Sequence, residues 1–314
     1  MKLDVGFSST NDKQDSNILI IGASGFLGSN ILLGLEGKQK CWAHSLTRRI
    51  NLAGTKGIQA DLRTPKSAKE LLANLRPSLV VNCAALANIE ACEREPELAK
   101  RLNADLPAEL AEGCRALGAK LVHVSTDAVC DDATDNCEVT SIKSPKNVYG
   151  YTKASGEDLV LSILPTALVI RTNIIGWSPT GTRSLLEFFL SALVRKQQVN
   201  GFHDSLFRPI SACNFWPIVS EWLRDEKFGV MHAVGSELIS KYEFGCRVAH
   251  AFDFNSDVIS RTSINESDLG RLRGRSLNLR PSEIGESDLI DIDLALRDLR
   301  ILSESGYRER LSQI

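Results

Sequence analysis

The sequence predicts an α/β fold: a doubly wound, Rossmann-type parallel sheet with a smaller C-terminal lobe. Two observations support this prediction. Short apolar runs rich in β-branched residues alternate with longer helical stretches through the first half of the chain, and a glycine-rich turn follows the first run. Because a strand, a crossover helix and a second parallel strand form one unit, the alternation favours helices on both faces of a single sheet.

The predicted elements begin at residue 17, after a polar stretch over residues 1–16 that is expected to be a flexible leader. The first strand contains Ile18-Leu19-Ile20-Ile21, a run too short for a helix and typical of a strand buried on both faces. Further strands are expected before Asp61 and over residues 41–46, 79–82, 120–125 and 167–171. Helices are expected over residues 25–35, 65–75, 97–117 and 148–161.

The alternation breaks down after Gly176. Helical patterns recur over residues 184–196, 215–223 and 240–252, whereas the strands between them are weak. We therefore expect a Rossmann domain over residues 17–176 and a mainly substrate-binding lobe over 177–314, with elements around 205–237 returning to the first sheet.

The composition is that of an ordinary globular protein. Hydrophobic residues make up 43% of the 314 residues and the net charge is −2, with no long Lys/Arg run, so neither nucleic acid nor a membrane surface is an expected partner. Neither a signal-peptide core nor a stretch of about 20 apolar residues is present, and a cytoplasmic location is expected. The eight cysteines and five histidines lack ligand spacing, so no metal site is predicted and most cysteines are expected to be reduced.

The glycine-rich turn, Gly22-Ala23-Ser24-Gly25-Phe26-Leu27-Gly28, follows a strand and opens a helix. Its glycines let the backbone turn tightly and approach a pyrophosphate, whose charge is stabilised at the helix N-terminus. The strand–turn–helix context is what distinguishes a dinucleotide site from a simple turn. The residues expected to contact the dinucleotide here are Gly22, Ser24, Gly25, Phe26, Leu27 and Gly28.

The residues after the second strand indicate which dinucleotide is bound. An NAD enzyme places a carboxylate there, about 20 residues past the loop, whereas this chain has Thr47-Arg48-Arg49. Because an arginine suits a 2′-phosphate, Thr47 and Arg48 favour NADP(H). The alternative is a pair of solvated arginines.

Two further segments are expected to contact the cofactor. Asp61-Leu62 is placed to meet the adenine ring, although it can also cap the helix that begins near Thr64-Pro65. The small residues Cys83, Ala84 and Ala85, at the end of a strand, would let the cofactor lie flat across the sheet edge, although they can equally serve packing.

Tyr149 and Lys153 lie four residues apart at the start of a helix and therefore project from one face. A free tyrosine has a pKa of about 10. We expect the Lys153 ammonium to lower the pKa of Tyr149 and make it a usable proton donor, with Lys153 also binding the nicotinamide ribose. Tyr151 is a competing phenol.

Ser125-Thr126-Asp127 follows the fifth strand, at the carboxyl edge where open α/β sheets bind ligands. Thr126 would orient a substrate carbonyl, and Asp127 would either assist its polarisation or hold a loop. The expected chemistry is hydride transfer from NADPH to a carbonyl carbon, with Tyr149 protonating the alkoxide.

Taken together, these segments resemble the dTDP-4-dehydrorhamnose reductase family of extended short-chain dehydrogenases/reductases. The resemblance runs from about residue 18 to 176 and rests on residues 22–28, 80–85, 95–97, 102–105, 123–127 and 147–153. It implies reduction of the C4 keto group of a dTDP-linked deoxy sugar by NADPH, with Thr126, Asp127, Tyr149 and Lys153 as the catalytic residues. It also implies that Asn103 shapes the site.

The chain departs from the family's pattern where the sugar is expected to bind. Ala128-Val129-Cys130 replaces an aromatic pair, and a tryptophan is missing from Asn173-Ile174-Ile175-Gly176, so the sugar and its nucleotide stay open. Arg183, His203, Arg208 and Arg280 are candidate diphosphate contacts, with Arg208 favoured, although each can equally be a surface residue. The expected substrate contacts are Ala85, Ser125, Thr126, Asn173, Ile174 and Arg208.

Two alternative functions remain. One is a nucleotide-sugar epimerase or dehydratase on the same fold, against which Arg48 and Ala128 speak. The other is a non-catalytic, NADP-binding regulatory subunit, as the beta subunit of methionine adenosyltransferase looks to be. The oligomeric state cannot be read from the sequence, although a homodimer is compatible with it.

Overall fold

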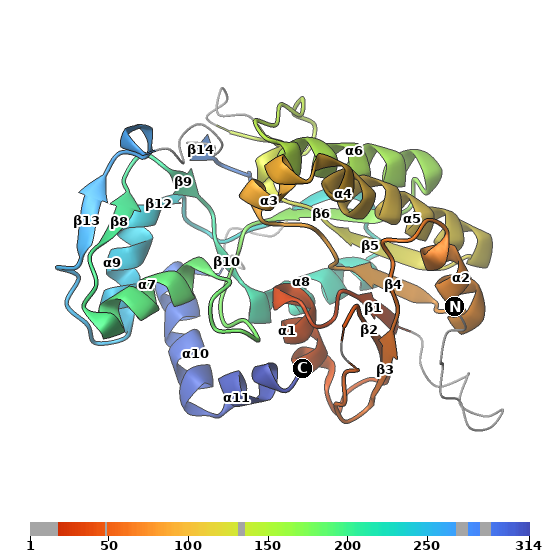
Figure 1. Cartoon of the computed structure of the whole chain (residues 1–314), viewed down its shortest axis with the longest axis horizontal. Coiled ribbons are helices and arrows are strands. Elements are labelled where there is room, and N and C mark those ends of the chain that lie inside the picture. Colours follow the sequence, from red (N-terminus) through yellow and green to blue (C-terminus); the bar gives the residue numbers. More distant parts are fainter. Residues whose placement is uncertain (1–17, 48, 131–135, 268–275, 283–289) are drawn as a thin grey trace.

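The computed structural model describes residues 18–47, 49–130, 136–267, 276–282 and 290–314. The predicted leader over residues 1–16 and Arg48 lie outside these described residues. Figure 1 shows a large parallel sheet flanked by helices, with a group of short strands and helices at one end.

The main sheet has seven strands in the order β11-β6-β5-β4-β1-β2-β3, and every neighbouring pair is parallel. This arrangement confirms the predicted α/β, Rossmann-type fold. The order reverses direction between β1 and β4, so ligands are expected at the carboxyl ends of these two strands. The strands are β1 (Ile18–Ile21), β2 (Cys41–Ser45), β3 (Thr55–Gln59), β4 (Leu79–Asn82), β5 (Lys120–Val124), β6 (Leu168–Thr172) and β11 (Gly229–Ala233).

Two apolar clusters cover the two faces of this sheet. Ile18 and Ile20 of β1 belong to one cluster and Leu19 and Ile21 to the other, as alternation along a strand requires. The first cluster includes α1 (Phe26–Leu35) and α8 (Ala212–Arg224). The second includes α2 (Ser67–Leu75), α5 (Leu106–Leu117) and α6 (Val148–Ile163).

The single helix expected over residues 97–117 is divided into three segments. These are α4 (Pro96–Lys100), a π-helical turn (Arg101–Asp105) and α5, and a short helix α3 (Ile89–Arg94) precedes them. The π-helical turn brings its backbone against α6, where a Cβ on Gly156 would lie 2.2 Å from the carbonyl oxygen of Asn103. Glycine at position 156 is therefore a packing requirement of this contact.

The second half of the chain contributes to both parts of the molecule. Strand β11 joins the main sheet beside β6, and α8 packs on α1. The remaining elements form small sheets and helices, several of them grouped beside α9 in Figure 1. They are β7 (Ile174–Ile175), α7 (Leu185–Arg195), β8 (Val199–Phe202), β9 (Leu206–Phe207), β10 (Ile210–Ser211), β12 (Ile239–Ser240), α9 (Lys241–Ala251), β13 (Ile259–Thr262), β14 (Ser276–Leu277), α10 (Ile292–Glu304) and α11 (Tyr307–Ser312).

Asn30 on α1 joins distant parts of the chain. Its Nδ2 donates to the carbonyl of Trp177 at 2.9 Å, and its Oδ1 accepts from the hydroxyl of Tyr307 on α11 at 2.9 Å. Helix α1 is thus fixed by residues that follow it by more than a hundred positions. Among the described residues, no helix combines the length and apolar character needed to cross a bilayer.

Candidate active site

The glycine-rich turn lies between β1 and α1, at the point where the strand order reverses. Gly22 has a φ of +75°, and a Cβ on Gly28 would lie 2.4 Å from the carbonyl oxygen of Gly22. Helix α1 begins directly after Gly25, so its free backbone N–H groups face the turn. These features fit a dinucleotide pyrophosphate.

His44 of β2 holds this turn from behind, a role that sequence analysis did not predict. The backbone N–H of Gly22 donates to Nδ1 of His44 at 3.4 Å, and Nε2 lies 3.0 Å from the carbonyl oxygen of Ala60. The imidazole is therefore neutral, with its proton on Nε2. Burial lowers the pKa of His44 to about 4, which preserves this arrangement at neutral pH. The available signal was a polar residue inside a buried strand.

The two positions expected to contact the adenosine end differ in their surroundings. Thr47 is exposed, and its carbonyl accepts a hydrogen bond from the Gln59 side chain at 3.2 Å. Asp61 is paired with Arg63 at 2.7 Å, which lowers the pKa of its carboxyl group. The alternative reading of Asp61 as a helix cap is wrong, because α2 has Lys66 at its N-cap; Leu62 is buried in the core.

The small residues after β4 lie against the glycine-rich turn. Cys83 and Ala84 are half-buried and Ala85 is exposed. A Cβ on Gly22 would lie 2.8 Å from the backbone nitrogen of Ala84, so the two segments are in close contact. Ala84 also donates from its backbone to Oδ1 of Asn82 at 3.1 Å.

Asn103 braces the loop after β4. Its side chain accepts from the backbone N–H of Leu86 at 2.9 Å, and donates to the carbonyl of Leu86 at 3.0 Å and to Thr152 at 3.1 Å. It is fully buried. These three bonds join the β4 loop to α6.

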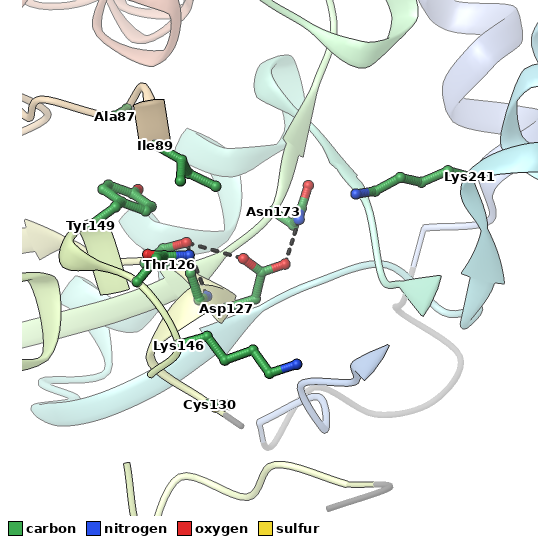
Figure 2. Close-up of a pocket in the computed structure, with 11 residues that line it drawn as sticks. Ala87, Ile89, Thr126, Asp127, Cys130, Lys146, Tyr149, Asn173 and Lys241 are labelled. Carbon is green, nitrogen blue, oxygen red and sulfur yellow. Dashed lines mark hydrogen bonds between the residues drawn. The ribbon is translucent and has the colours of Figure 1, made fainter. Parts of the chain in front are cut away.

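A cavity of about 170 Å³ opens beyond the carboxyl end of β5 (Figure 2). It is lined by Ala87, Ile89, Thr126, Asp127, Ala128, Cys130, Lys146, Asn147, Tyr149, Asn173 and Lys241. Four residues predicted from the sequence meet here, namely Thr126, Asp127, Tyr149 and Asn173. Sequence analysis missed Lys146 and Lys241, which place two cationic side chains at its rim.

Asp127 accepts hydrogen bonds at both of its carboxyl oxygens. Its Oδ1 accepts from the Thr126 hydroxyl at 3.0 Å, and its Oδ2 accepts from the side-chain amide of Asn173. Burial raises the pKa of Asp127, and these two hydrogen bonds and the Lys241 charge partly oppose that rise. Figure 2 shows the amine of Lys241 reaching toward this pair from α9.

Tyr149 is the second residue of helix α6, and its side chain enters the cavity (Figure 2). Asn147 caps this helix through a 2.7 Å hydrogen bond from the backbone of Gly150. Tyr151 is 60% exposed and does not line the cavity. Burial raises the pKa of Tyr149 to about 12, although a hydrogen bond with Thr126 lowers it in part.

Lys153 does not have the effect expected from the sequence. Its Nζ donates to the carbonyl of Val124 at 2.6 Å and lies 3.4 Å from Nε2 of His123, and burial lowers its pKa to about 8. The predicted lowering of the Tyr149 pKa by Lys153 is wrong for this structure. The physical reason is that the amine is held at the sheet, while desolvation controls the phenol.

Four expected substrate contacts do not line this cavity. The hydroxyl of Ser125 donates to buried Glu157 at 2.5 Å, and Arg208 donates to Asn278 at 2.8 Å and to the carbonyl of Ser236 at 2.5 Å. Ile174 lies in β7, which pairs with β10, and Ala85 is exposed on the β4 loop.

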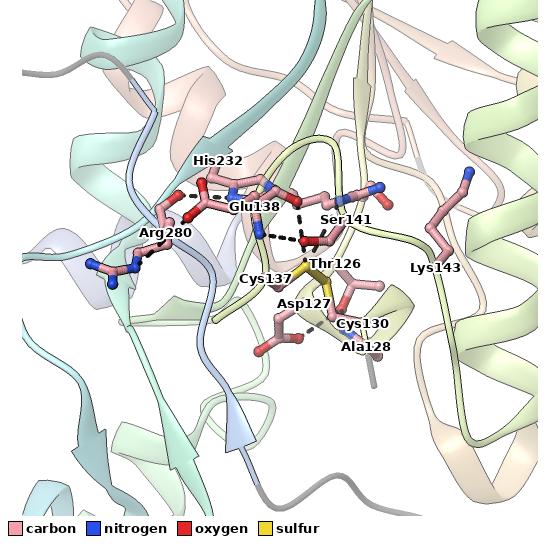
Figure 3. Close-up of a disulfide and its surroundings, with 12 residues drawn as sticks. Thr126, Asp127, Ala128, Cys130, Cys137, Glu138, Ser141, Lys143, His232 and Arg280 are labelled. Carbon is pink, nitrogen blue, oxygen red and sulfur yellow. Dashed lines mark hydrogen bonds and ion pairs between the residues drawn. A yellow bond between two sulfur atoms is a disulfide. The ribbon is translucent and has the colours of Figure 1, made fainter. Parts of the chain in front are cut away.

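A disulfide joins Cys130, at the cavity wall, to Cys137 (Figure 3). Cys137 also bonds to the segment after β14, donating to the carbonyl of Asn278 at 2.8 Å and accepting from the N–H of Arg280 at 3.0 Å. The cavity wall is therefore tied to the C-terminal half of the chain. The other six cysteines are free, in line with the expectation that most are reduced.

Comparison with known proteins places this arrangement in context. Residues 16–283 match the RmlD substrate binding domain family. The chain is 27% identical to rat (Rattus norvegicus) methionine adenosyltransferase 2 subunit beta over 279 residues, covering 85% of this chain and 81% of the relative. It is 31% identical to a Mycobacterium tuberculosis dTDP-4-dehydrorhamnose reductase over 173 residues, covering 54% of this chain and 52% of the relative.

The fold resembles solved structures over nearly its whole length. A Bacillus anthracis dTDP-4-dehydrorhamnose reductase in complex with NADP superimposes with a TM-score of 0.80, at 18% identity, covering 92% of this chain and 99% of the other. Because the family match spans most of the residues, including both halves described above, it applies to the chain as a whole. The chain belongs to the RmlD substrate binding domain family.

Proposed function

We propose that this protein uses NADPH to reduce the 4-keto group of a nucleotide-linked deoxy sugar, with dTDP as the favoured nucleotide. The single observation that carries the proposal is the meeting of Thr126, Asp127 and Tyr149 in one cavity at the carboxyl edge of the sheet. The name of the M. tuberculosis relative and the NADP bound in the B. anthracis structure support it.

Tyr149 is the proposed proton donor. A phenol whose pKa is about 12 is fully protonated at neutral pH, which is the form that reduction requires. The hydroxyl of Thr126 lies beside it, and its one hydrogen, donated to Asp127 in this structure, would turn to the substrate oxygen as negative charge develops there. NADPH, when bound, supplies the hydride.

Asp127 and Lys241 have supporting roles in this proposal. The carboxyl group of Asp127 accepts from Thr126 and would hold its hydroxyl beside Tyr149 until the substrate oxygen takes over that hydrogen. Lys241 and Lys146 at the cavity rim would attract an anionic substrate such as a sugar diphosphate. Lys153 and the residues of the glycine-rich turn would hold the dinucleotide, together with Thr47 and Arg48 at its adenosine end.

The test is net oxidation of NADPH in the presence of dTDP-, UDP- and GDP-linked 4-keto sugars. Consumption of one equivalent of NADPH per sugar supports a reductase, and preference for NADPH over NADH supports the role of Arg48. Conversion of a sugar without net NADPH consumption would instead support the epimerase alternative. Absence of both reactions would contradict the proposal.

A subunit role is the second candidate, because a relative covering 85% of this chain is named as a methionine adenosyltransferase beta subunit. Stoichiometric co-purification of such an enzyme would favour this role, and it is compatible with bound NADP(H). We also propose a homodimer, a cytoplasmic location and a division of the chain into residues 17–176 and 177–314. Sedimentation, localisation and limited proteolysis, respectively, test these three proposals.

A further inference from the structure

His123 lies in β5 directly beneath the amine of Lys153, and the function proposed above gives it no role. It is fully buried, between Asn82 of β4 and Lys153 of α6. Its Nδ1 is 3.1 Å from Nδ2 of Asn82, and its Nε2 is 3.4 Å from Nζ of Lys153. The protons on this imidazole and on the lysine amine must be placed so that each contact pairs a donor with an acceptor.

The orientation of the Asn82 amide determines the tautomer of His123. Oδ1 of Asn82 accepts a hydrogen bond from the backbone N–H of Ala84 at 3.1 Å, so the opposite end of the amide, Nδ2, is the donor that faces His123. Nδ1 of His123 must then be an acceptor. A neutral imidazole with an unprotonated Nδ1 carries its hydrogen on Nε2, facing Lys153.

This tautomer restricts the protonation state of Lys153. An ammonium group has no lone pair, so it cannot accept a hydrogen bond from the Nε2–H of His123. A neutral amine can accept that bond and still donate to the carbonyl of Val124 at 2.6 Å. The contact geometry is therefore satisfied by the neutral amine and opposed by the charged one.

We propose that His123, held in its Nε2–H tautomer by Asn82, is a positioning residue that fixes the Lys153 amine at the carboxyl edge of the sheet and favours its neutral form. The consequence for catalysis rests on the function proposed above, since Lys153 is placed there to bind the nicotinamide ribose. The protonation states do not depend on that function.

The groups around Lys153 act on its protonation in both directions. Burial is the main cause that lowers the pKa of Lys153 to about 8, and burial together with the Lys153 charge lowers that of His123 well below its usual value. Cys83 after β4 and Glu157 on α6 act in the opposite direction on Lys153. Glu157, however, is already paired with Arg171 at 2.9 Å.

The first test reads the tautomer directly in the unmodified protein. Nitrogen-15 NMR of the full chain, labelled in histidine and lysine, is expected to show a neutral His123 protonated on Nε2. The Lys153 amine is expected to titrate below the ordinary lysine range. A proton on Nδ1 of His123 would overturn the proposal without any variant being made and whether or not the protein turns over a sugar.

The second test reverses the tautomer. In Asn82→Asp the carboxylate keeps the bond from Ala84 but accepts from His123, so the proton moves to Nδ1 and Nε2 becomes an acceptor for the Lys153 ammonium. The midpoint pH of the Lys153 titration should rise by about one unit or more. His232→Phe, at another buried histidine on β11, is the matched control and should leave this midpoint unchanged.

A double-mutant cycle separates this effect from the added charge of the aspartate. If His123 transmits the change, the rise in midpoint is lost when Asn82→Asp is made in a His123→Phe background. If the same rise persists there, simple charge attraction explains it and the positioning role is refuted. In turnover assays, His123→Phe should move the pH profile of kcat while leaving KM for the sugar within about threefold.

Discussion

The side-chain amide of Asn173 donates a hydrogen bond to Oδ2 of Asp127, joining the residue after β6 to the one that follows Thr126. The bond holds a carboxyl group in a buried cavity wall with its second oxygen directed at Thr126. Asp127 thus orients a neighbouring hydroxyl at the expense of burying a charge.

Asp127→Asn should therefore change the pH dependence of stability. Burial raises the pKa of Asp127 in the folded state, so its contribution to stability is fully present below the ordinary value of 3.8 and is lost as the pH rises through the raised pKa. The asparagine of the variant does not titrate, so the variant does not lose this stability as the pH rises. In urea unfolding, the free energy of unfolding of the variant relative to that of the wild type should increase between pH 4 and pH 7, while turnover falls. An unchanged difference across this range would show that the buried carboxylate carries no such cost.

Tyr149→Phe should remove the proton donor while leaving cofactor binding intact. The expected loss of turnover is at least about 10²-fold, measured by NADPH oxidation, with an unchanged Kd for NADPH from fluorescence titration. Tyr151→Phe is the control, because that side chain is 60% exposed and does not line the cavity. Equal activities of the two variants would remove Tyr149 from the mechanism.

Gly28→Ala should displace the glycine-rich turn. The added Cβ would lie 2.4 Å from the carbonyl oxygen of Gly22, so the turn must move away from helix α1 and affinity for NADPH should fall at least about tenfold. Gly34→Ala, in the same helix, meets no atom within 4 Å and should stabilise the protein by up to about 1 kcal/mol. Calorimetric binding and thermal unfolding of both variants would reveal whether the packing at position 28 matters.

Glu157→Gln should be strongly destabilising. The carboxylate and Arg171 form a buried pair at 2.9 Å, and removing one charge leaves the guanidinium buried without its partner, at a cost of about 3–5 kcal/mol. Burial raises the pKa of Glu157, but the hydrogen bond and charge of Arg171 outweigh it and lower that pKa overall. The stabilisation by the Glu157 carboxylate is therefore present above the ordinary value of 4.5 and is lost as the pH falls. Asp158→Asn breaks a largely exposed contact with Lys143 and should cost less than about 1 kcal/mol. Similar costs for both variants in urea titrations at pH 7 would contradict the special role of burial.

Reduction of the Cys130–Cys137 disulfide should lower the free energy of unfolding by about 2–3 kcal/mol, because the bond closes a short loop in the unfolded chain. The double variant Cys130→Ser/Cys137→Ser should show the same decrease and should no longer respond to dithiothreitol. Cys246→Ser, at a free cysteine, is the control and should retain the response. A wild type that is insensitive to reductant would argue against a stabilising bond.

The sequence allowed the fold class to be predicted because local pattern and global architecture agree in the first half of the chain. The run at residues 18–21 is buried on every side, and its neighbours alternate with helices as a parallel sheet requires. The division of the expected helix 97–117 could not be foreseen, because the π-helical turn accompanies bonds from Asn103 to Leu86 and Thr152, far away in sequence. Two-residue strands such as β9 and β12 are too short to leave a periodic pattern.

The sequence indicated the site residues that follow strand ends. It did not indicate the residues that tertiary packing brings to the cavity from distant elements. Thr126 and Tyr149 were expected together because both follow the fifth strand. Lys241 reaches the cavity from α9, and no local feature of the sequence indicates that approach. The protonation behaviour of Tyr149 and Lys153 depends on burial, which spacing along a helix does not reveal.

The contacts of Asn30 bear on how the protein is made. Helix α1 is completed by bonds from Trp177 and Tyr307, so its final neighbours are synthesised long after it leaves the ribosome. A nascent chain that ends before residue 307 presents α1 with part of its packing surface uncovered. Chaperones that recognise apolar helices would encounter this segment during most of translation. The final packing of helix α1 therefore has to wait until residue 307 has been synthesised.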